Sequence, residues 1–317
     1  MGLAVWAALC CSCSALVPAG TRGEESDDGS EASAGEPDLP RPDPADIVVA
    51  TFNVHLFFDT RCDSGQCGSG AFEEAPSESQ FKFKADQLVA AIRDLDADIV
   101  VLQEVENQTC LDALTTRLGD AYPSAVLGET GYPASVDVAV LSRFPVLETR
   151  KHGSSPLQRP SGGITYFSRE FLEVHLDGEG HRVIVFAAHF KAKFDDDAER
   201  RLAEGTRARE IIDDVAADHS EALIVLGGDL NDTPDSPALT VLQADGGMLR
   251  VAGDVVPDDW TYRYDGDRTA IDHILMATAA SGGRYVAQSA LVFHGQTGDG
   301  YGGSDHAALR ASFRAGE

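Results

Sequence analysis

Positive charge is scarce in this chain of 317 residues. Lysine and arginine together number 25, against 52 aspartates and glutamates, so the formal net charge is −27. This balance disfavours simple electrostatic attraction to a polyanion. A polyanion would bind only where a metal ion or a local basic groove offsets the acidic surface, and most of the carboxylates are expected to be solvated.

The apolar start of the chain is too short and too interrupted to be a membrane span. Residues 1–20 are rich in alanine and resemble the hydrophobic region of a secretory signal. Cys10, Cys11 and Cys13 leave three alternatives open: a lipoprotein-type attachment that tethers the protein to a membrane, a cleaved signal, or a disordered end. We therefore expect an exported protein that is extracellular, periplasmic or anchored at the surface as a lipoprotein.

Large apolar side chains are almost absent between residues 21 and 46, where nine acidic residues stand among Ser, Gly and Pro. Such a segment buries too little apolar surface to fold, so we expect a disordered acidic linker. From residue 47 to residue 317, short apolar runs alternate with helical patterns and no internal repeat is found. This pattern predicts one contiguous α/β domain, and we expect a monomer.

Seven apolar runs rich in Val, Ile, Leu and Phe are predicted to be strands. They are Ile47–Phe52, Asp98–Gln103, Val136–Leu141, Phe171–Leu176, Val183–Ala188, Ala222–Leu226 and Ile271–Met276. Apolar spacing and composition predict three helices. These are Lys82–Leu95, Ala198–Ala217 and Ser236–Ala244.

Cysteine is rare in the part expected to fold, which contains Cys62, Cys67 and Cys110. Cys62 and Cys67 bracket a short polar loop and are expected to form a disulfide in an oxidising compartment. A zinc site is the alternative, but no second Cys or His pair at suitable spacing completes it. Cys110 is expected to be a small buried apolar side chain.

Polar side chains follow several of the predicted strands. Asn53, Glu104, His189, Asp229 and Asn231 each stand just after an apolar run. Ligand sites in α/β proteins gather at strand ends and in the loops that follow them. Each residue alone has a plainer explanation as a turn or a solvated side chain, but the set indicates that these side chains converge.

The segment after Gly227-Gly228 carries two kinds of polar residue. Asp232 or Thr233 is expected to cap a helix that begins near the following proline. That explanation does not extend to Asp229 or Asn231, which we therefore retain as candidate site residues.

Asp272 lies inside an apolar strand, and a buried carboxylate must be paired or hydrogen-bonded. An imidazole is its natural partner, because the carboxylate orients the ring and makes it more basic. Strand alternation puts Asp272 and His273 on opposite faces. The predicted partner is therefore His306.

Six motifs in order resemble those of the endonuclease/exonuclease/phosphatase superfamily, the deoxyribonuclease I-like group, with exported bacterial members most similar. They are Thr51–Val54 with Phe57–Asp59, Gln103–Asn107, His189–Lys193, Gly228–Asp232, Ile271–Leu275 and Ser304–His306. The resemblance implies an α/β four-layer sandwich, in which two mixed β-sheets pack together and are flanked by helices. It covers essentially the whole part expected to fold.

The resemblance also implies a divalent metal ion, usually Mg²⁺, held by Asn53, Glu104 and Asp305. Oxygen ligands without a thiolate favour Mg²⁺, Mn²⁺ or Ca²⁺ over Zn²⁺. A hard dication at such a site would neutralise the charge that develops on a phosphate ester under attack by water.

The resemblance further implies that Asp229 and Asn231 orient the attacking water and the phosphate. His306, oriented by Asp272, would act either as the general base or as a charged contact to the phosphate. His189 would contact the scissile phosphate from the other side. The choice between Asp229 and the His306–Asp272 pair as base stays open.

Two further residues, Arg169 and Lys191, are candidates for contact with the substrate phosphate. Together these features predict a metal-dependent phosphoric ester hydrolase, first of all a phosphodiesterase or nuclease that uses a metal-activated water. A sphingomyelinase-like or phosphoinositide-type lipid phosphohydrolase is the alternative, followed by a non-catalytic binding protein with the same fold.

Overall fold

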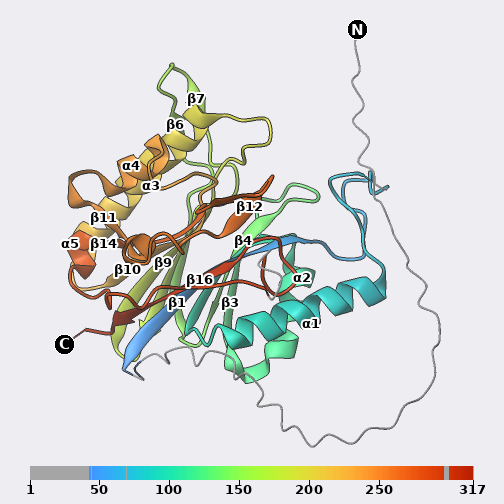
Figure 1. Ribbon diagram of the computed structural model, residues 1–317, viewed down its shortest axis with the longest axis horizontal. Helices are drawn as coiled ribbons and strands as arrows, with labels where there is room; N and C mark the ends of the chain where they lie inside the picture. Colours follow the sequence, from blue (N-terminus) through green and yellow to red (C-terminus); the bar gives the residue numbers. More distant parts are fainter. Residues whose placement is uncertain (1–42, 44, 69, 296–299, 317) are drawn as a thin grey trace, which may run out of the picture. The chain divides into compact units, whose positions relative to one another are not determined.

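The computed structural model describes residues 43, 45–68, 70–295 and 300–316 (Figure 1). The expected export segment, residues 1–20, and nearly all of the expected linker lie outside the described residues and stay predictions. Among the helices in the described ranges, none has the length and apolar character needed to span a membrane.

Two six-stranded mixed sheets form the middle of the folded part (Figure 1). The first sheet has the order β15 (Leu291–Phe293), β16 (Ala308–Arg314), β1 (Asp46–Phe57), β2 (Ile99–Val105), β4 (Asp137–Ser142) and β3 (Ser124–Gly128). The second has the order β11 (Met248–Arg250), β14 (Asp272–Ala277), β10 (Leu223–Asp229), β9 (His181–His189), β8 (Leu172–Gly178) and β5 (Val146–Lys151). Two short hairpins complete the strands, β6–β7 (Leu157–Gln158 and Ile164–Thr165) and β12–β13 (Tyr262–Tyr264 and Asp267–Thr269).

Side-chain alternation along the strands sorts the apolar residues into layers. On β1 the even-numbered residues from 48 to 54 pack with α1 (Glu78–Asp94) and α2 (Gln108–Leu118), whereas Ile47 and Val49 face the second sheet. On β9 the even-numbered residues from 184 to 188 pack with α3 (Ala198–Asp218) and α4 (Pro237–Gln243), whereas Val183 and Val185 face the first sheet. The layers are therefore helix, sheet, sheet and helix, which confirms the expected four-layer α/β sandwich.

All seven predicted strands and all three predicted helices are present, with boundaries shifted by a few residues or extended. The predicted helix cap at Asp232 or Thr233 is wrong. Ser236 caps α4 instead, because its side chain accepts a hydrogen bond from the Leu239 amide and Pro237 follows at the first helical position. Asp232 instead pairs with Arg201 of α3, at 3.1 Å between Oδ2 and Nε.

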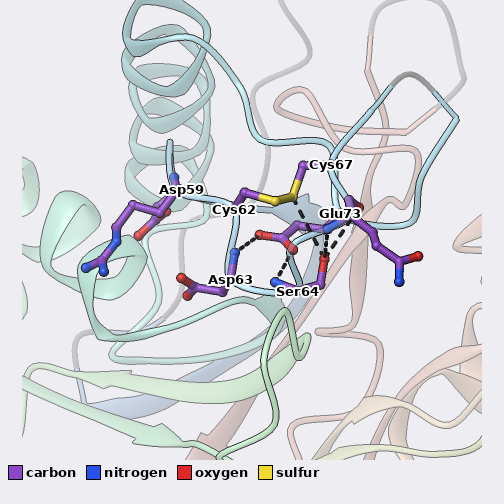
Figure 2. Close-up of a disulfide and its surroundings, with 8 residues drawn as sticks. Asp59, Cys62, Asp63, Ser64, Cys67 and Glu73 are labelled. Atoms are coloured by element: carbon purple, nitrogen blue, oxygen red, sulfur yellow. Dashed lines mark hydrogen bonds between the residues drawn. A yellow bond between two sulfur atoms is a disulfide. The ribbon is translucent and has the colours of Figure 1, made fainter.

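The disulfide expected between Cys62 and Cys67 is present in the loop between β1 and α1 (Figure 2). Glu73 lies beside it, and its buried carboxylate accepts the backbone amides of Asp63 at 2.6 Å and Ser64 at 2.7 Å. Cys110 is free and buried, as expected.

Candidate active site

Strand alternation carries four polar side chains into the layer between the two sheets. The inward face of β1 continues to Asn53, that of β9 to His189, that of β10 to Asp229 and that of β14 to Asp272. His189 is in register with Asp229 across the parallel β9–β10 pair, and Asp229 is in register with Asp272 across the antiparallel β10–β14 pair. The ends of β1, β9, β10 and β14 that carry these four side chains therefore meet at one edge of the sandwich.

Asn53 joins the two sheets at this edge. Its Nδ2 donates to Asp229 Oδ2 at 3.0 Å and to Glu104 Oε1 at 3.2 Å. Its Oδ1 accepts the His55 backbone amide at 3.0 Å. Because Asn53 is fully buried, these contacts fix its orientation and bring the two carboxylates towards each other.

Glu104 reaches the site through a break in the regular strand. Gln103 points between the sheets, where its amide donates to Thr51 Oγ1 at 3.1 Å, so strict alternation would turn Glu104 towards the helices. Instead Glu104 has a φ of 67°, and the pairing of β2 with β4 shifts register at this position. The Leu56 amide then donates to Glu104 Oε2 at 2.7 Å.

The pairing of Asp272 with His306 that alternation predicts is present. His306 Nδ1 lies 2.9 Å from Asp272 Oδ2, and both residues are buried. Burial disfavours the imidazolium, but the Asp272 carboxylate, with Asp229 and Asp305, raises the pKa of His306. His273 faces the other way and contacts Arg250 and the Asp232 carbonyl.

Asp229 lies between two imidazoles. Its Oδ2 is 3.7 Å from His189 Nε2 and 4.0 Å from His306 Nε2. Burial, followed by the charge of Asp272, raises the pKa of Asp229. Burial, followed by the charges of Arg169 and His306, lowers the pKa of His189, which favours the neutral form of its ring. The pKa values of the two histidines are therefore shifted in opposite directions.

Asn231 and Asp305 complete the predicted set. The Asn231 amide donates to Asp229 Oδ1 at 2.8 Å, and its side-chain nitrogen donates to the Phe190 carbonyl at 3.1 Å. Asp305 Oδ1 lies 2.9 Å from His55 Nδ1 and 3.9 Å from His306 Nε2. Asp305 therefore borders the site from the loop that precedes β16.

Arg169 and Lys191 differ in their surroundings. Arg169 has no hydrogen bond or ion pair with any residue of the described ranges, although it interacts electrostatically with Glu104 and Asp229. Burial lowers the pKa of Arg169, but a guanidinium stays charged in proteins. Lys191 Nζ donates to the backbone carbonyls of Ala192 and Phe194, so it braces its own loop.

Two residues at the site were not predicted from the sequence. Lys84 of α1 lies near both Asp305 and Glu104, and burial, opposed by these carboxylates, lowers its pKa to about 8. The Tyr262 ring lies 4.6 Å from the His306 ring between centroids. No local pattern marks either residue, because each reaches the site from an element distant in the chain.

The donors present fit a hard divalent cation. Asp229, Asp272 and His306 each offer a ligand atom within 4.8 Å of the others, and Asp272 Oδ1 is buried without a partner among the described residues. Two more carboxylates lie beside this group: Glu104, linked to Asp229 through Asn53, and Asp305, 3.9 Å from His306. This oxygen-rich, thiolate-free set suits Mg²⁺, Mn²⁺ or Ca²⁺.

The profile of the Endonuclease/Exonuclease/phosphatase family matches residues 50–306. The chain belongs to this family. Members of the endonuclease/exonuclease/phosphatase family are generally phosphoesterase hydrolases that use divalent metals. No curated protein sequence matches the chain.

Solved structures of the family share this fold. D. rerio TDP2 with a single-strand DNA product is 15% identical, with a TM-score of 0.59 over 85% of this chain and 99% of that one. The human nocturnin catalytic domain with bound sulfate is 16% identical, with a TM-score of 0.58 over 85% and 94%. A Bacteroides vulgatus endonuclease/exonuclease/phosphatase is 19% identical, with a TM-score of 0.58 over 84% and 98%. At these identities the likeness shows the fold alone.

Proposed function

We propose that the protein is a divalent-metal-dependent phosphodiesterase of the nuclease type. The observation that carries the proposal is the arrangement around Asp229. It lies within 4.0 Å of two imidazoles and accepts a hydrogen bond from Asn53, whose Nδ2 also donates to Glu104. Arg169, a cation without a partner in the described ranges, interacts electrostatically with Glu104 and Asp229. Carboxylates, imidazoles and a free guanidinium in one place suit the hydrolysis of an anionic ester.

Glu104 and Asn53, with Asp305, would hold the metal ion, which when bound supplies a positive charge to the phosphoryl oxygens. Of the two candidate bases we assign Asp229 to accept the proton of the attacking water, because it lies between His189 and His306 and its Oδ1 is fixed by the Asn231 amide. His306 is held as a donor by Asp272 and is placed to contact a phosphate oxygen. Arg169 would balance the remaining charge of the diester.

The test compares bis-nitrophenyl phosphate with mono-nitrophenyl phosphate, in Mg²⁺ and in EDTA. We expect turnover of the diester that EDTA abolishes and added Mg²⁺ restores, and Mn²⁺ and Ca²⁺ are tested in place of Mg²⁺. A panel of DNA, RNA, sphingomyelin and phosphoinositides separates the nuclease from a lipid phosphohydrolase. Absence of metal-dependent turnover on every substrate would favour a non-catalytic binding protein.

We also propose that the protein acts after export. The Cys62–Cys67 disulfide supports this, because disulfides persist in oxidising compartments. Mass spectrometry of the mature N-terminus from medium, periplasm and membrane fractions distinguishes a cleaved signal from lipid attached at Cys10, Cys11 or Cys13. Recovery of an unprocessed chain in the cytoplasm would contradict export.

A further inference from the structure

Three large apolar side chains are exposed on the two segments that flank the candidate active site. Phe194, in the loop between β9 and α3, is 90% exposed, and it follows His189 by five residues. Ile164 of β7 and Tyr166 just after it are 58% and 51% exposed, and Tyr166 precedes Arg169 by three residues. Exposed apolar groups of this size beside a site indicate a binding surface.

The two segments, residues 157–169 and 189–201, are held together by buried and paired charges. The fully buried Glu204 of α3 accepts the backbone amides of Ser168 at 2.7 Å and Lys191 at 2.8 Å. Arg159 forms two hydrogen bonds to Asp197, at 2.9 and 2.7 Å. The β6–β7 hairpin is thereby fixed against the loop that begins α3 (Figure 1). The segments that carry the exposed side chains are therefore held in place before a ligand binds.

The same segments are a basic strip in an acidic chain. Residues 157–169 and 189–201 contain six basic and four acidic residues, a net charge of +2, whereas the whole chain carries −27. Asp196 and Asp197 are neutralised by Arg201 and Arg159. Within the described residues the ammonium of Lys191 donates to backbone carbonyls and to no carboxylate. Lys193 pairs with Asp232 at 3.4 Å, and Arg200 lies 3.8 Å from Glu204. The strip is therefore far less acidic than the rest of the chain, and Arg169 and Lys191 form no ion pair with the described residues, so an anionic polymer meets less repulsion here than elsewhere on the surface.

Resting on the proposed function, we infer that this strip binds single-stranded nucleic acid next to the scissile phosphate. Phe194 and Tyr166 offer ring faces on which bases stack. Lys193, whose side chain is 52% exposed beside Asp232, contacts a flanking phosphate, and Arg169 contacts the scissile one. A single strand fits because its one phosphate backbone can follow these two segments alone, whereas a duplex brings a second phosphate backbone against the acidic remainder of the surface.

A membrane suits the strip less well. Phe194 is followed directly by Asp195 and Asp196, both exposed, so insertion of the ring into hydrocarbon would carry charged side chains out of water. Stacking on a base covers one face of the ring and leaves those carboxylates solvated. The acidic residues therefore favour the nucleic acid strand as the occupant.

The experiment measures binding of a fluorescent oligothymidylate strand to the full chain in EDTA, where turnover of the strand is suppressed. Phe194→Ala and Tyr166→Ala are each expected to weaken binding by roughly tenfold. Lys193→Gln is expected to reduce the slope of log affinity against log salt by about 0.7. Phe83→Ala, a matched loss of an aromatic that is 65% exposed on α1, is expected to leave affinity unchanged.

Two results would overturn the inference. The first is equal strand affinity in wild type, Phe194→Ala and Tyr166→Ala. The second is binding of wild type to phosphatidylcholine vesicles that Phe194→Ala abolishes, which would make the strip a membrane surface. Strand binding in EDTA is measured independently of turnover of the small diester in Mg²⁺. A failure of strand binding therefore refutes this inference without refuting the proposed phosphodiesterase activity, and the reverse also holds.

Discussion

Replacing His306 by alanine perturbs the centre of the candidate site. The residue is 6% exposed, its Nδ1 lies 2.9 Å from Asp272 Oδ2, and its Nε2 lies 4.0 Å from Asp229 Oδ2. The substitution removes the group that we propose contacts the substrate phosphate. It also leaves the Asp272 carboxylate without a side-chain partner, because its other oxygen already lacks one among the described residues.

The substitution is expected to lower both the catalytic rate and the stability of the fold, and each loss has its own magnitude. Removal of one prearranged donor at a reacting oxyanion lowers kcat by about 10²–10³-fold. Removal of one member of a buried charge pair destabilises the fold by about 3–5 kcal/mol, because the remaining charge stays buried. His306→Ala is therefore expected to be both inactive and less stable.

A second variant separates these effects. In His306→Ala/Asp272→Asn the stranded charge is removed, so we expect much of the stability to return while activity does not. The assays are kcat for bis-nitrophenyl phosphate in Mg²⁺ and urea unfolding at the same pH. Wild-type-like turnover by folded His306→Ala would refute its assigned role. Equal stability of the single and double variants would refute the buried charge pair.

Three further predictions follow from other contacts. Glu104→Gln is expected to raise the Mg²⁺ concentration for half-maximal turnover by at least about tenfold, because a charged ligand is lost. Glu210→Gln, on the exposed face of α3, is the control. An unchanged metal requirement in Glu104→Gln would exclude Glu104 as a ligand. Arg169→Gln is expected to lower kcat/KM by roughly 10-fold or more, since a charge-assisted contact to phosphate is lost, and a rate equal to wild type would place this guanidinium away from the substrate. At Glu173, burial opposes ionisation, but His152, His175 and Arg150 lower the pKa to about 2. This carboxylate therefore contributes stability above pH 4.5, and that contribution is lost as the pH falls towards 2. Glu173→Gln is expected to remove about 3 kcal/mol of the pH dependence of the unfolding free energy. Urea midpoints between pH 2 and 6 that fall in parallel for wild type and Glu173→Gln would contradict this prediction.

Much of the fold and part of the site follow from periodicity. Apolar runs of alternating burial mark the strands, and the same alternation places Asn53, His189, Asp229 and Asp272 on the inward face. It also selects His306 over His273 as the partner of Asp272. These predictions succeed because they depend on local geometry that every strand obeys.

The remainder depends on tertiary placement. Lys84 and Tyr262 reach the site only because α1 and the β12–β13 hairpin are packed at this edge, and their sequences carry no mark of it. Asp232 occupies a position that suits a helix cap, but the buried Arg201 of α3 pairs with it. Partners from distant segments override local preference where a buried charge needs compensation.

Backbone conformation accounts for the orientation of the site oxygens. His55, Leu56 and Asn231 have φ values of 52°, 43° and 52°, which L-residues other than Asn rarely adopt. The backbone amide of His55 donates to Asn53 Oδ1, and that of Leu56 donates to Glu104 Oε2. The Asn231 amide donates to Asp229 Oδ1. Main-chain donors at these positions, of which His55 and Leu56 are strained, therefore hold one oxygen of each side chain. Such strain persists where the surrounding structure fixes it and is typical of functional sites. Rotation of these side chains would leave the amides without acceptors, so the site keeps its geometry before substrate arrives.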